Sequence, residues 1–196
     1  TESRSSATES RLSATESRSS ATETGPSSGE SNPSLAENPP DPSKLAPEIA
    51  FTLYQGSDEL GGESLSISGL RGKPLVINFW AGLCPPCRAE MPDFQEFYEE
   101  NRERVTLLGI DVGQFTGLGD QNAAKALLNE LGVTYPAGFT DDANVMRAYK
   151  ILAMPTTVFI SSNGELFRTW GGVLNSEKLT EVTNDMLQEE PNTSSY

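Results

Sequence analysis

A chain of 196 residues with no histidine, two cysteines and a formal net charge of −14 is unsuited to two common kinds of function. Proteins that bind nucleic acid need clusters of lysine and arginine, and a closed zinc site needs about four cysteine or histidine ligands. We therefore expect no nucleic-acid partner and no bound metal.

Residues 1–42 contain a seven-residue repeat, TESRSSA, TESRLSA, TESRSSA, TETGPSS, followed by a proline-rich linker. A coiled coil needs two apolar positions per heptad, but the only large apolar side chains of this segment are Leu12 and Leu35. We interpret residues 1–42 as a disordered Ser/Thr/Glu-rich stalk and linker, and residues 191–196 as a disordered tail. No stretch approaches the ~18 to 20 apolar residues of a membrane span. We expect a tether to lie in an N-terminal segment missing from this chain.

Residues 43–190 have the usual size of one globular domain. Short alternating runs separated by glycine-rich turns predict a β-hairpin at residues 49–53 and about 63–67. Continuous apolar runs of strand length predict strands that are buried on both faces, at residues 73–80, 105–112 and 156–161. A turn at residues 161–164 then leads into an antiparallel edge strand at residues 165–172.

Helices are predicted between these strands, from Pro85 to about Glu103, at about 120–131, at 143–150 and at about 176–188. Strands that alternate with helices and end in a hairpin and a helix predict an α/β fold, with a mixed sheet flanked by helices on both faces. Ligand chemistry in such sheets gathers at the carboxyl ends of the strands. The stretch CPPC, residues 84–87, lies there, directly after the predicted central strand.

Both cysteines of the chain belong to this one C-x-x-C pair. A purely structural disulfide between them would stabilise the fold little, because closing so short a loop hardly constrains the unfolded chain. Cys84 precedes a proline and should be the last non-helical residue, with Pro85 at the first helical position. Its sulfur then lies at the positive end of the helix dipole, which favours the thiolate. The pattern indicates a redox dithiol in which Cys84 attacks and Cys87 resolves.

Four prolines bear on this site. Pro85 and Pro86 have no N–H, so the first backbone donor available to the Cys84 sulfur is Cys87. With fewer donors the thiolate is less stabilised, and we expect a more reducing couple. Pro92 should kink the predicted helix, and Pro155 opens a strand at a position where a cis bond is plausible.

The stretches FWAGLCPPC and MPTTVFI, together with Pro92, resemble the thioredoxin superfamily. The fuller phrase KPLVINFWAGLCPPCRAEMPDFQEFYEE resembles the extracytoplasmic TlpA/ResA/DsbE branch, and FTL…LSISGLRGKP resembles the N-terminal hairpin of that branch. The resemblance covers residues 45 to about 188 and implies a thioredoxin fold with an added N-terminal β-hairpin.

The resemblance also implies residue roles. It makes Cys84 the nucleophile, Cys87 the resolving thiol and Pro155 a cis-proline that faces the disulfide. It implies that the Met154 backbone pairs with an extended substrate peptide. Asn78 stands where thioredoxins proper carry a buried aspartate used for proton transfer, so that acid/base group is absent.

Three further residues follow from the same comparison of motifs. Glu90 matches a glutamate near the active site of ResA-like proteins and could tune the thiols or move protons; the alternative is a surface carboxylate on a helix. Leu83 replaces the tryptophan that usually lines the docking surface before the first cysteine, beside Pro85 and Pro86. Trp80 is expected to pack beneath the site.

The resulting hypothesis is a monomeric thiol-disulfide oxidoreductase that reduces protein disulfides outside the cytoplasm, with the Cys84–Cys87 disulfide as its redox centre and no other cofactor. The resemblance extends its candidate partners to apocytochrome c and to a membrane thiol-disulfide electron donor. A peroxiredoxin-like peroxidase is an alternative, although Ala81 occupies the position of its activating threonine. A copper carrier would need a histidine, which leaves a redox-inert substrate-holding module as the other alternative.

Overall fold

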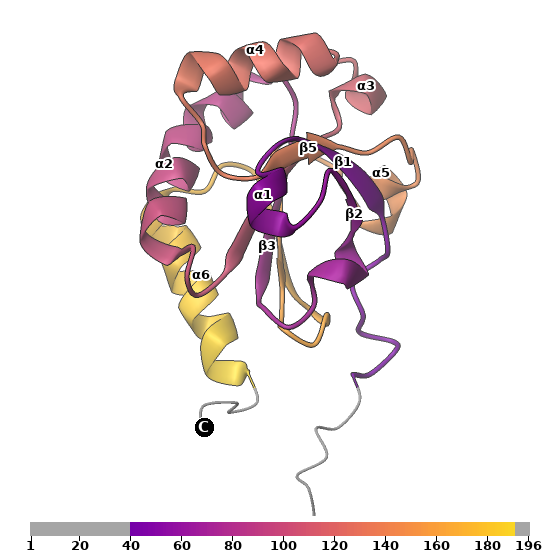
Figure 1. Ribbon diagram of the computed structural model, residues 1–196, viewed down its shortest axis with the longest axis vertical. Coiled ribbons are helices and arrows are strands. Elements are labelled where there is room, and N and C mark those ends of the chain that lie inside the picture. Colours follow the sequence, from indigo (N-terminus) through magenta and orange to yellow (C-terminus); the bar gives the residue numbers. More distant parts are fainter. Residues whose placement is uncertain (1–39, 191–196) are drawn as a thin grey trace, which may run out of the picture. The chain divides into compact units, whose positions relative to one another are not determined.

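The computed structural model describes residues 40–190 (Figure 1). The predicted stalk, apart from residues 40–42, and the predicted tail at residues 191–196 lie outside the described residues.

A seven-stranded mixed sheet forms the centre of the described region, with the strand order β2-β1-β5-β4-β3-β6-β7. Strands β3, β4 and β5 are parallel to one another, whereas the other neighbours pair antiparallel. The strands are β1 (Ala50–Gln55), β2 (Ser64–Ser66), β3 (Leu75–Trp80), β4 (Thr106–Asp111), β5 (Ala137–Phe139), β6 (Thr156–Ile160) and β7 (Leu166–Gly171). The predicted mixed sheet, its three core strands and the edge strand β7 are confirmed.

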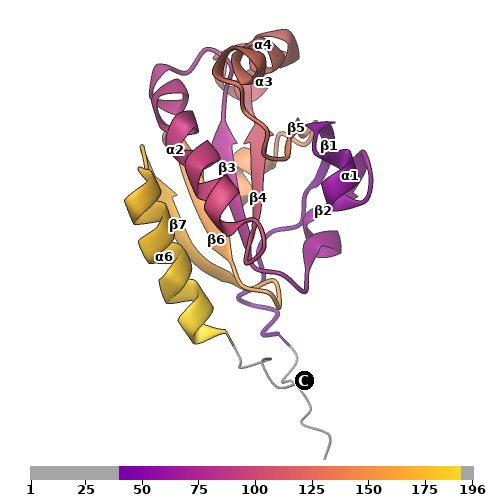
Figure 2. The same cartoon turned by 60° about the vertical axis from the view of Figure 1, so that its left-hand side comes forward.

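Helices cover both faces of this sheet, as predicted. The helical segments are α1 (Ser57–Leu60), η1 (Ile67–Leu70, a 3-10 helix), α2 (Pro85–Asn101), α3 (Gly113–Thr116), α4 (Gln121–Leu131), α5 (Val145–Ala148) and α6 (Ser176–Glu189). Helices α2 and α6 lie side by side (Figure 2) and pack, together with α4, on one face. The short segments α5 and η1 contribute to the core on the opposite face.

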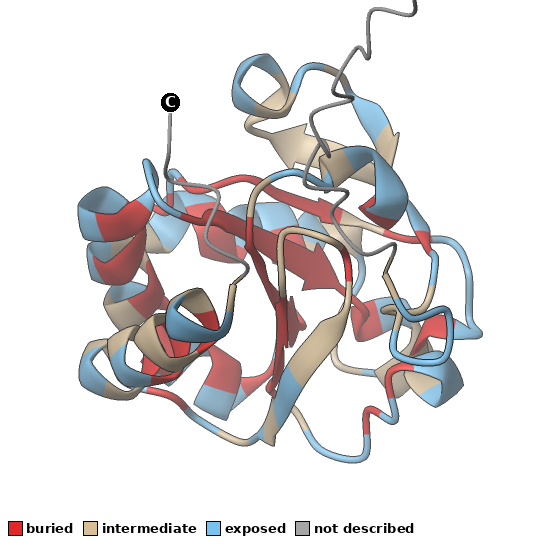
Figure 3. Ribbon diagram, turned by 90° about the horizontal axis from the view of Figure 1, so that it is seen from below, coloured by how far each residue is buried: buried red, intermediate tan, exposed pale blue. Residues whose placement is uncertain are grey.

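Strand β3 explains why the central apolar run shows no alternation. All six of its residues are buried, as are those of the adjoining strands β4 and β6 (Figure 3). Val76 and Trp80 pack under α2, while Ile77 and Phe79 point into the opposite core layer. Each fully buried side chain of this size stabilises the fold by roughly 1.5–3 kcal/mol relative to an exposed one. The sheet is therefore rigid where the C-x-x-C segment leaves it.

The predicted N-terminal hairpin is confirmed, and the three-residue strand β5 joins it to the rest of the sheet. The sequence did not predict β5, which reads only Ala-Gly-Phe. A Cβ at Gly138 would lie 2.2 Å from the Thr52 carbonyl oxygen, so glycine lets β1 approach this closely. The one-turn helices α1 and α3 and the 3-10 helix η1 were not predicted either.

Candidate active site

The two cysteines lie where β3 gives way to α2. Cys84 is the N-cap residue, with extended backbone angles of φ −94° and ψ 107°, and Pro85 is the first helical residue, as predicted. The cysteines form a disulfide with a Cα–Cα distance of 5.3 Å. The Cys87 N–H donates a hydrogen bond to the Cys84 Sγ at 3.3 Å, in keeping with the absence of an N–H on both prolines. The Cys84 sulfur therefore lies at the helix N-terminus, where the dipole favours a thiolate.

The disulfide is almost covered although its surroundings are not. Cys84 is 2% exposed and Cys87 is fully buried, whereas Pro85 and Pro86 lie at the surface. Cys84 is thus the cysteine with some access to solvent. A reaction partner has to approach over the exposed side chains next to it.

The Met154–Pro155 peptide bond is cis, the form that the resemblance implies. Pro155 is buried and immediately precedes β6, which runs antiparallel to β3 with Phe79 opposite Thr156. It therefore lies at the end of the sheet where β3 stops, next to the segment that carries the disulfide. Its carbonyl oxygen accepts a hydrogen bond from the Gly172 N–H at 2.8 Å, which ties it to the loop after β7. The pairing of the half-buried Met154 with a substrate stays a prediction.

Three exposed aliphatic side chains belong to segments that meet at this end of the sheet. Among residues 40–190, the large apolar side chains that are exposed are Leu83 (64%), Leu152 (94%) and Val173 (49%). Leu83 precedes Cys84, Leu152 lies three residues before Pro155, and Val173 follows β7. We call these three residues the aliphatic rim. The sequence pointed only to Leu83, because Leu152 and Val173 belong to loops whose place beside the disulfide depends on the strand order.

Glu90 lies one turn along α2 from Cys87. Its side chain is fully buried, so the alternative of a surface carboxylate was wrong. Its Oε1 accepts a hydrogen bond from the Asn78 amide at 2.8 Å, and its Oε2 accepts one from the Leu174 N–H at 3.1 Å. Burial raises the pKa of Glu90 to about 7, against the lowering effect of both hydrogen bonds. The carboxyl group can therefore gain and lose a proton near neutral pH.

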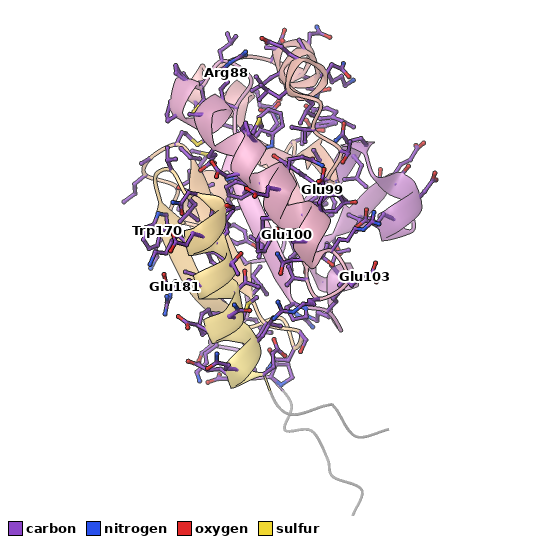
Figure 4. All side chains as sticks on the ribbon, turned by 90° about the vertical axis from the view of Figure 1, so that its left-hand side faces the viewer. Arg88, Glu99, Glu100, Glu103, Trp170 and Glu181 are labelled. Carbon is purple, nitrogen blue, oxygen red and sulfur yellow. A yellow bond between two sulfur atoms is a disulfide. The ribbon has the colours of Figure 1, made fainter. Side chains whose placement is uncertain are left out.

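The remaining face of α2 is polar. Arg88, Glu99 and Glu100 are exposed and project away from the core, as does Glu103 just beyond the helix (Figure 4). Pro92, inside α2, is exposed as well, and the kink predicted for it stays a prediction. Trp80 is fully buried and packs in the same core layer as Cys84 and Cys87.

A second buried carboxyl group, Asp111, ends β4 directly opposite Trp80. Its Oδ2 accepts a hydrogen bond from the Tyr54 hydroxyl at 3.1 Å, and its Oδ1 accepts one from the Gly113 N–H at 2.9 Å. Burial is the main cause that raises its pKa. No sequence motif pointed to this pair; the acidic residue at the carboxyl end of an apolar strand is the one signal of it in the sequence.

The arrangement is suited to thiol–disulfide exchange. It combines a sulfur at a helix N-terminus, a second sulfur bonded to it, a carboxyl group with a pKa of about 7 and three exposed aliphatic side chains at the same end of the sheet. Within residues 40–190, no three cysteine, aspartate or glutamate side chains are grouped as a metal site would need.

Comparisons with known proteins agree with this geometry. Residues 42–168 match the AhpC/TSA family. The thiol-disulfide oxidoreductase ResA of Oceanobacillus iheyensis is 34% identical over 140 residues, which cover 71% of each chain. The crystal structure of StoA from Bacillus subtilis is similar with a TM-score of 0.58 and 25% identity, over 71% of this chain and 98% of that one. A thiol:disulfide interchange protein of the thioredoxin family from Chlorobium tepidum has a TM-score of 0.60 at 23% identity, over 74% and 96% of the two chains, and shows the thioredoxin fold.

Proposed function

Because this chain belongs to the AhpC/TSA family and is a thiol-disulfide oxidoreductase, we propose that it reduces disulfide bonds of protein substrates, with Cys84 as the nucleophile and Cys87 as the resolving thiol. The observation that carries this proposal is the position of Cys84 at the N-cap of α2, directly after the exposed Leu83 of the aliphatic rim. A protein substrate can cover the rim while it presents its disulfide to the Cys84 sulfur.

The reaction takes place in two exchanges. The Cys84 thiolate attacks one sulfur of the substrate disulfide, forms a mixed disulfide and releases the other substrate sulfur as a thiolate, which takes up a proton. Cys87 loses its proton and attacks the Cys84 sulfur, which breaks the mixed disulfide and releases the second substrate thiol. Two electrons have then passed to the substrate, and the Cys84–Cys87 disulfide of the structure has formed. Glu90 is a candidate to take up the Cys87 proton, because its pKa of about 7 lets it act as a base near neutral pH.

The finer assignments belong to the same proposal. We place the reaction outside the cytoplasm, with apocytochrome c cysteines as candidate substrates and a membrane thiol-disulfide protein as the electron donor. The resemblance to the TlpA/ResA/DsbE branch supports this placement. In residues 40–190, no helix has both the length and the apolar character needed to cross a membrane. The redox centre is the cysteine pair itself, without a further cofactor.

Reduction of insulin by the purified chain, with dithiothreitol as the electron source, tests the proposal. We expect the wild type to accelerate reduction and Cys84→Ser to abolish the acceleration. Cys87→Ser should accumulate a mixed disulfide with the substrate, visible by mass spectrometry, because no resolving thiol remains. A wild type without activity would contradict the proposal and favour the substrate-holding module. Hydrogen peroxide in place of insulin tests the peroxidase alternative, and we expect no consumption because Ala81 offers no activating hydroxyl.

A further inference from the structure

The buried carboxyl group of Asp111 has no role in the exchange just described. It is 3% exposed, and a buried carboxyl group lowers stability unless hydrogen-bond donors surround it. Two donors, the Tyr54 hydroxyl and the Gly113 N–H, reach one oxygen each. It lies opposite Trp80, and Trp80 is four residues before Cys84. Asp111 is therefore at the same end of the sheet as the disulfide.

The Asp111 side chain is hydrogen-bonded to the start of the segment formed by residues 112–119. This segment is in turn hydrogen-bonded to the residues before Cys84. The Gly113 carbonyl oxygen accepts a hydrogen bond from the Leu118 N–H at 3.2 Å. The Leu118 carbonyl oxygen in turn accepts one from the Leu83 N–H at 2.7 Å, and the Val112 N–H donates to the Trp80 carbonyl oxygen at 2.9 Å. The two segments are thus joined at both ends by backbone hydrogen bonds.

The glycines of these segments pack closely against their neighbours. A Cβ on Gly113 would lie 2.8 Å from the Gly119 carbonyl oxygen, and one on Gly119 would lie 3.2 Å from the Leu83 Cγ. A Cβ on Gly82 would lie 2.5 Å from the backbone carbon of Ala123, in the first turn of α4. Gly119 leaves no room for a side chain against Leu83, so we expect a displacement near Asp111 to reach the residue before Cys84.

Tyr54 donates its hydrogen bond to the Asp111 carboxylate oxygen that does not bind Gly113. Its ring is stacked on Phe139 of β5 with centroids 5.3 Å apart, and the Lys125 ammonium group of α4 lies 5.1 Å from the ring centroid. The ring is therefore held by two elements besides its own strand β1. Its hydroxyl group is the only polar atom of the side chain and is directed at Asp111.

We propose that Tyr54 and Asp111 are positioning residues for thiol–disulfide exchange: their hydrogen bond fixes residues 112–119, and these hold Leu83 and the adjacent Cys84 at the N-terminus of α2. The role in exchange rests on the proposed function. The N-terminal hairpin, which carries Tyr54, thereby contributes to the reactivity of a sulfur that it does not contact.

Tyr54→Phe tests this inference, because it removes the hydroxyl group and keeps the ring. The matched control is Tyr149→Phe, which removes a buried hydroxyl that donates to the Pro47 carbonyl oxygen at 2.6 Å in the opposite core layer. Hydrogen exchange of the Leu83 amide, measured by NMR in the oxidised protein, reports on its bond to Leu118. We expect exchange at least tenfold faster in Tyr54→Phe than in Tyr149→Phe, and a Cys84 thiol pKa shifted toward that of free cysteine in the reduced protein.

Asp111→Asn should act in the same direction, since the amide oxygen still accepts from the Gly113 N–H, while the NH₂ group that then faces Tyr54 cannot accept a hydrogen bond from its hydroxyl. If Asp111→Asn does not fold, the Leu83 exchange rate in Tyr54→Phe alone tests the positioning role. A Leu83 exchange rate equal to that of the control would overturn the positioning role and leave insulin reduction by the wild type intact. Absence of insulin reduction by the wild type would instead overturn the proposed function, whatever the Leu83 amide does.

Discussion

Glu90 lies between the Asn78 amide and the Leu174 N–H with no solvent-exposed surface. Two hydrogen bonds to a carboxylate lower its pKa, but removal from water raises it more, and the result is a pKa of about 7. A single residue thus makes the charge beside the dithiol depend on pH in the physiological range.

The pKa of Glu90 predicts how stability depends on pH. Its folded-state value of about 7 exceeds the ordinary 4.5, so the folded protein binds this proton more tightly than the unfolded chain does. The stabilisation of the folded state by this tighter proton binding is complete below pH 4.5 and is lost as the pH rises through 7. Between these limits we expect the free energy of unfolding of the wild type to fall relative to Glu90→Gln, by up to about 3 kcal/mol. Urea unfolding of both proteins at pH 4.5, 6 and 8 measures this; parallel pH profiles would contradict it.

At the scale of elements, the first turn of α2 decides how the Cys84 thiolate is stabilised. An N-cap side chain accepts hydrogen bonds from the second or third helical N–H. The third belongs to Cys87 and donates at 3.3 Å, while Pro86 removes the second. The proline pair therefore leaves the sulfur with one of two backbone donors.

Pro86→Ala should restore the missing donor. One additional hydrogen bond to the thiolate stabilises the reduced form, so we expect the redox potential to become less negative by about 30 mV. Pro85→Ala is the control, because the first helical N–H is not placed to reach the N-cap side chain. Equilibration with glutathione measures both. A wild-type potential already as oxidising as about −120 mV, or equal effects of the two substitutions, would contradict this account.

The contact between the Gly82 loop and α4 gives a prediction about packing. A Cβ at Gly82 would lie 2.5 Å from backbone atoms of Ala123 and Ala124, which cannot move without shifting the helix. We expect Gly82→Ala to lower the free energy of unfolding by about 1–3 kcal/mol. Gly171→Ala is the matched control, since a Cβ there has no neighbour within 4 Å, and it should change stability by less than about 0.5 kcal/mol. Thermal unfolding of both variants decides, and equal losses would be inconsistent with this packing.

The elements that the sequence predicted are those whose pattern is local. Strand β3 is a continuous apolar run because both its faces are buried, and α2 begins at a proline after an N-cap residue. Strand β5 has no such pattern, since three residues containing a glycine become a strand only because β1 and β4 lie on either side of them. The one-turn helix α3 depends in the same way on the side chain of Asp111.

The same difference between local patterns and long-range contacts applies to the residues of the site. The sequence identifies Cys84 and Cys87, because their chemistry requires a fixed spacing and a helix start. The burial of Glu90 depends on the loop after β7, more than 80 residues away, and the Tyr54–Asp111 bond joins residues 57 positions apart. No local pattern encodes either contact.

At the scale of the whole described region, we expect the aliphatic rim to favour protein substrates over small ones. Leu152→Asp should raise the KM for insulin at least threefold, because a charge replaces an apolar contact at the docking surface, and should leave oxidation of dithiothreitol unchanged. Thr169→Asp, on the exposed part of β7, controls for the added charge. Equal KM values for the two variants would show that the rim does not contact the substrate.

The two outermost strands of the sheet bear on how the protein behaves in concentrated solution. Strand β2 is only three residues long with serine at both ends, and β7 carries the exposed Arg168 at the opposite border. Short or charged borders discourage another copy from adding its own strand. We therefore expect light scattering to report one monodisperse species up to millimolar concentration, so that self-association does not compete with the encounters that catalysis requires.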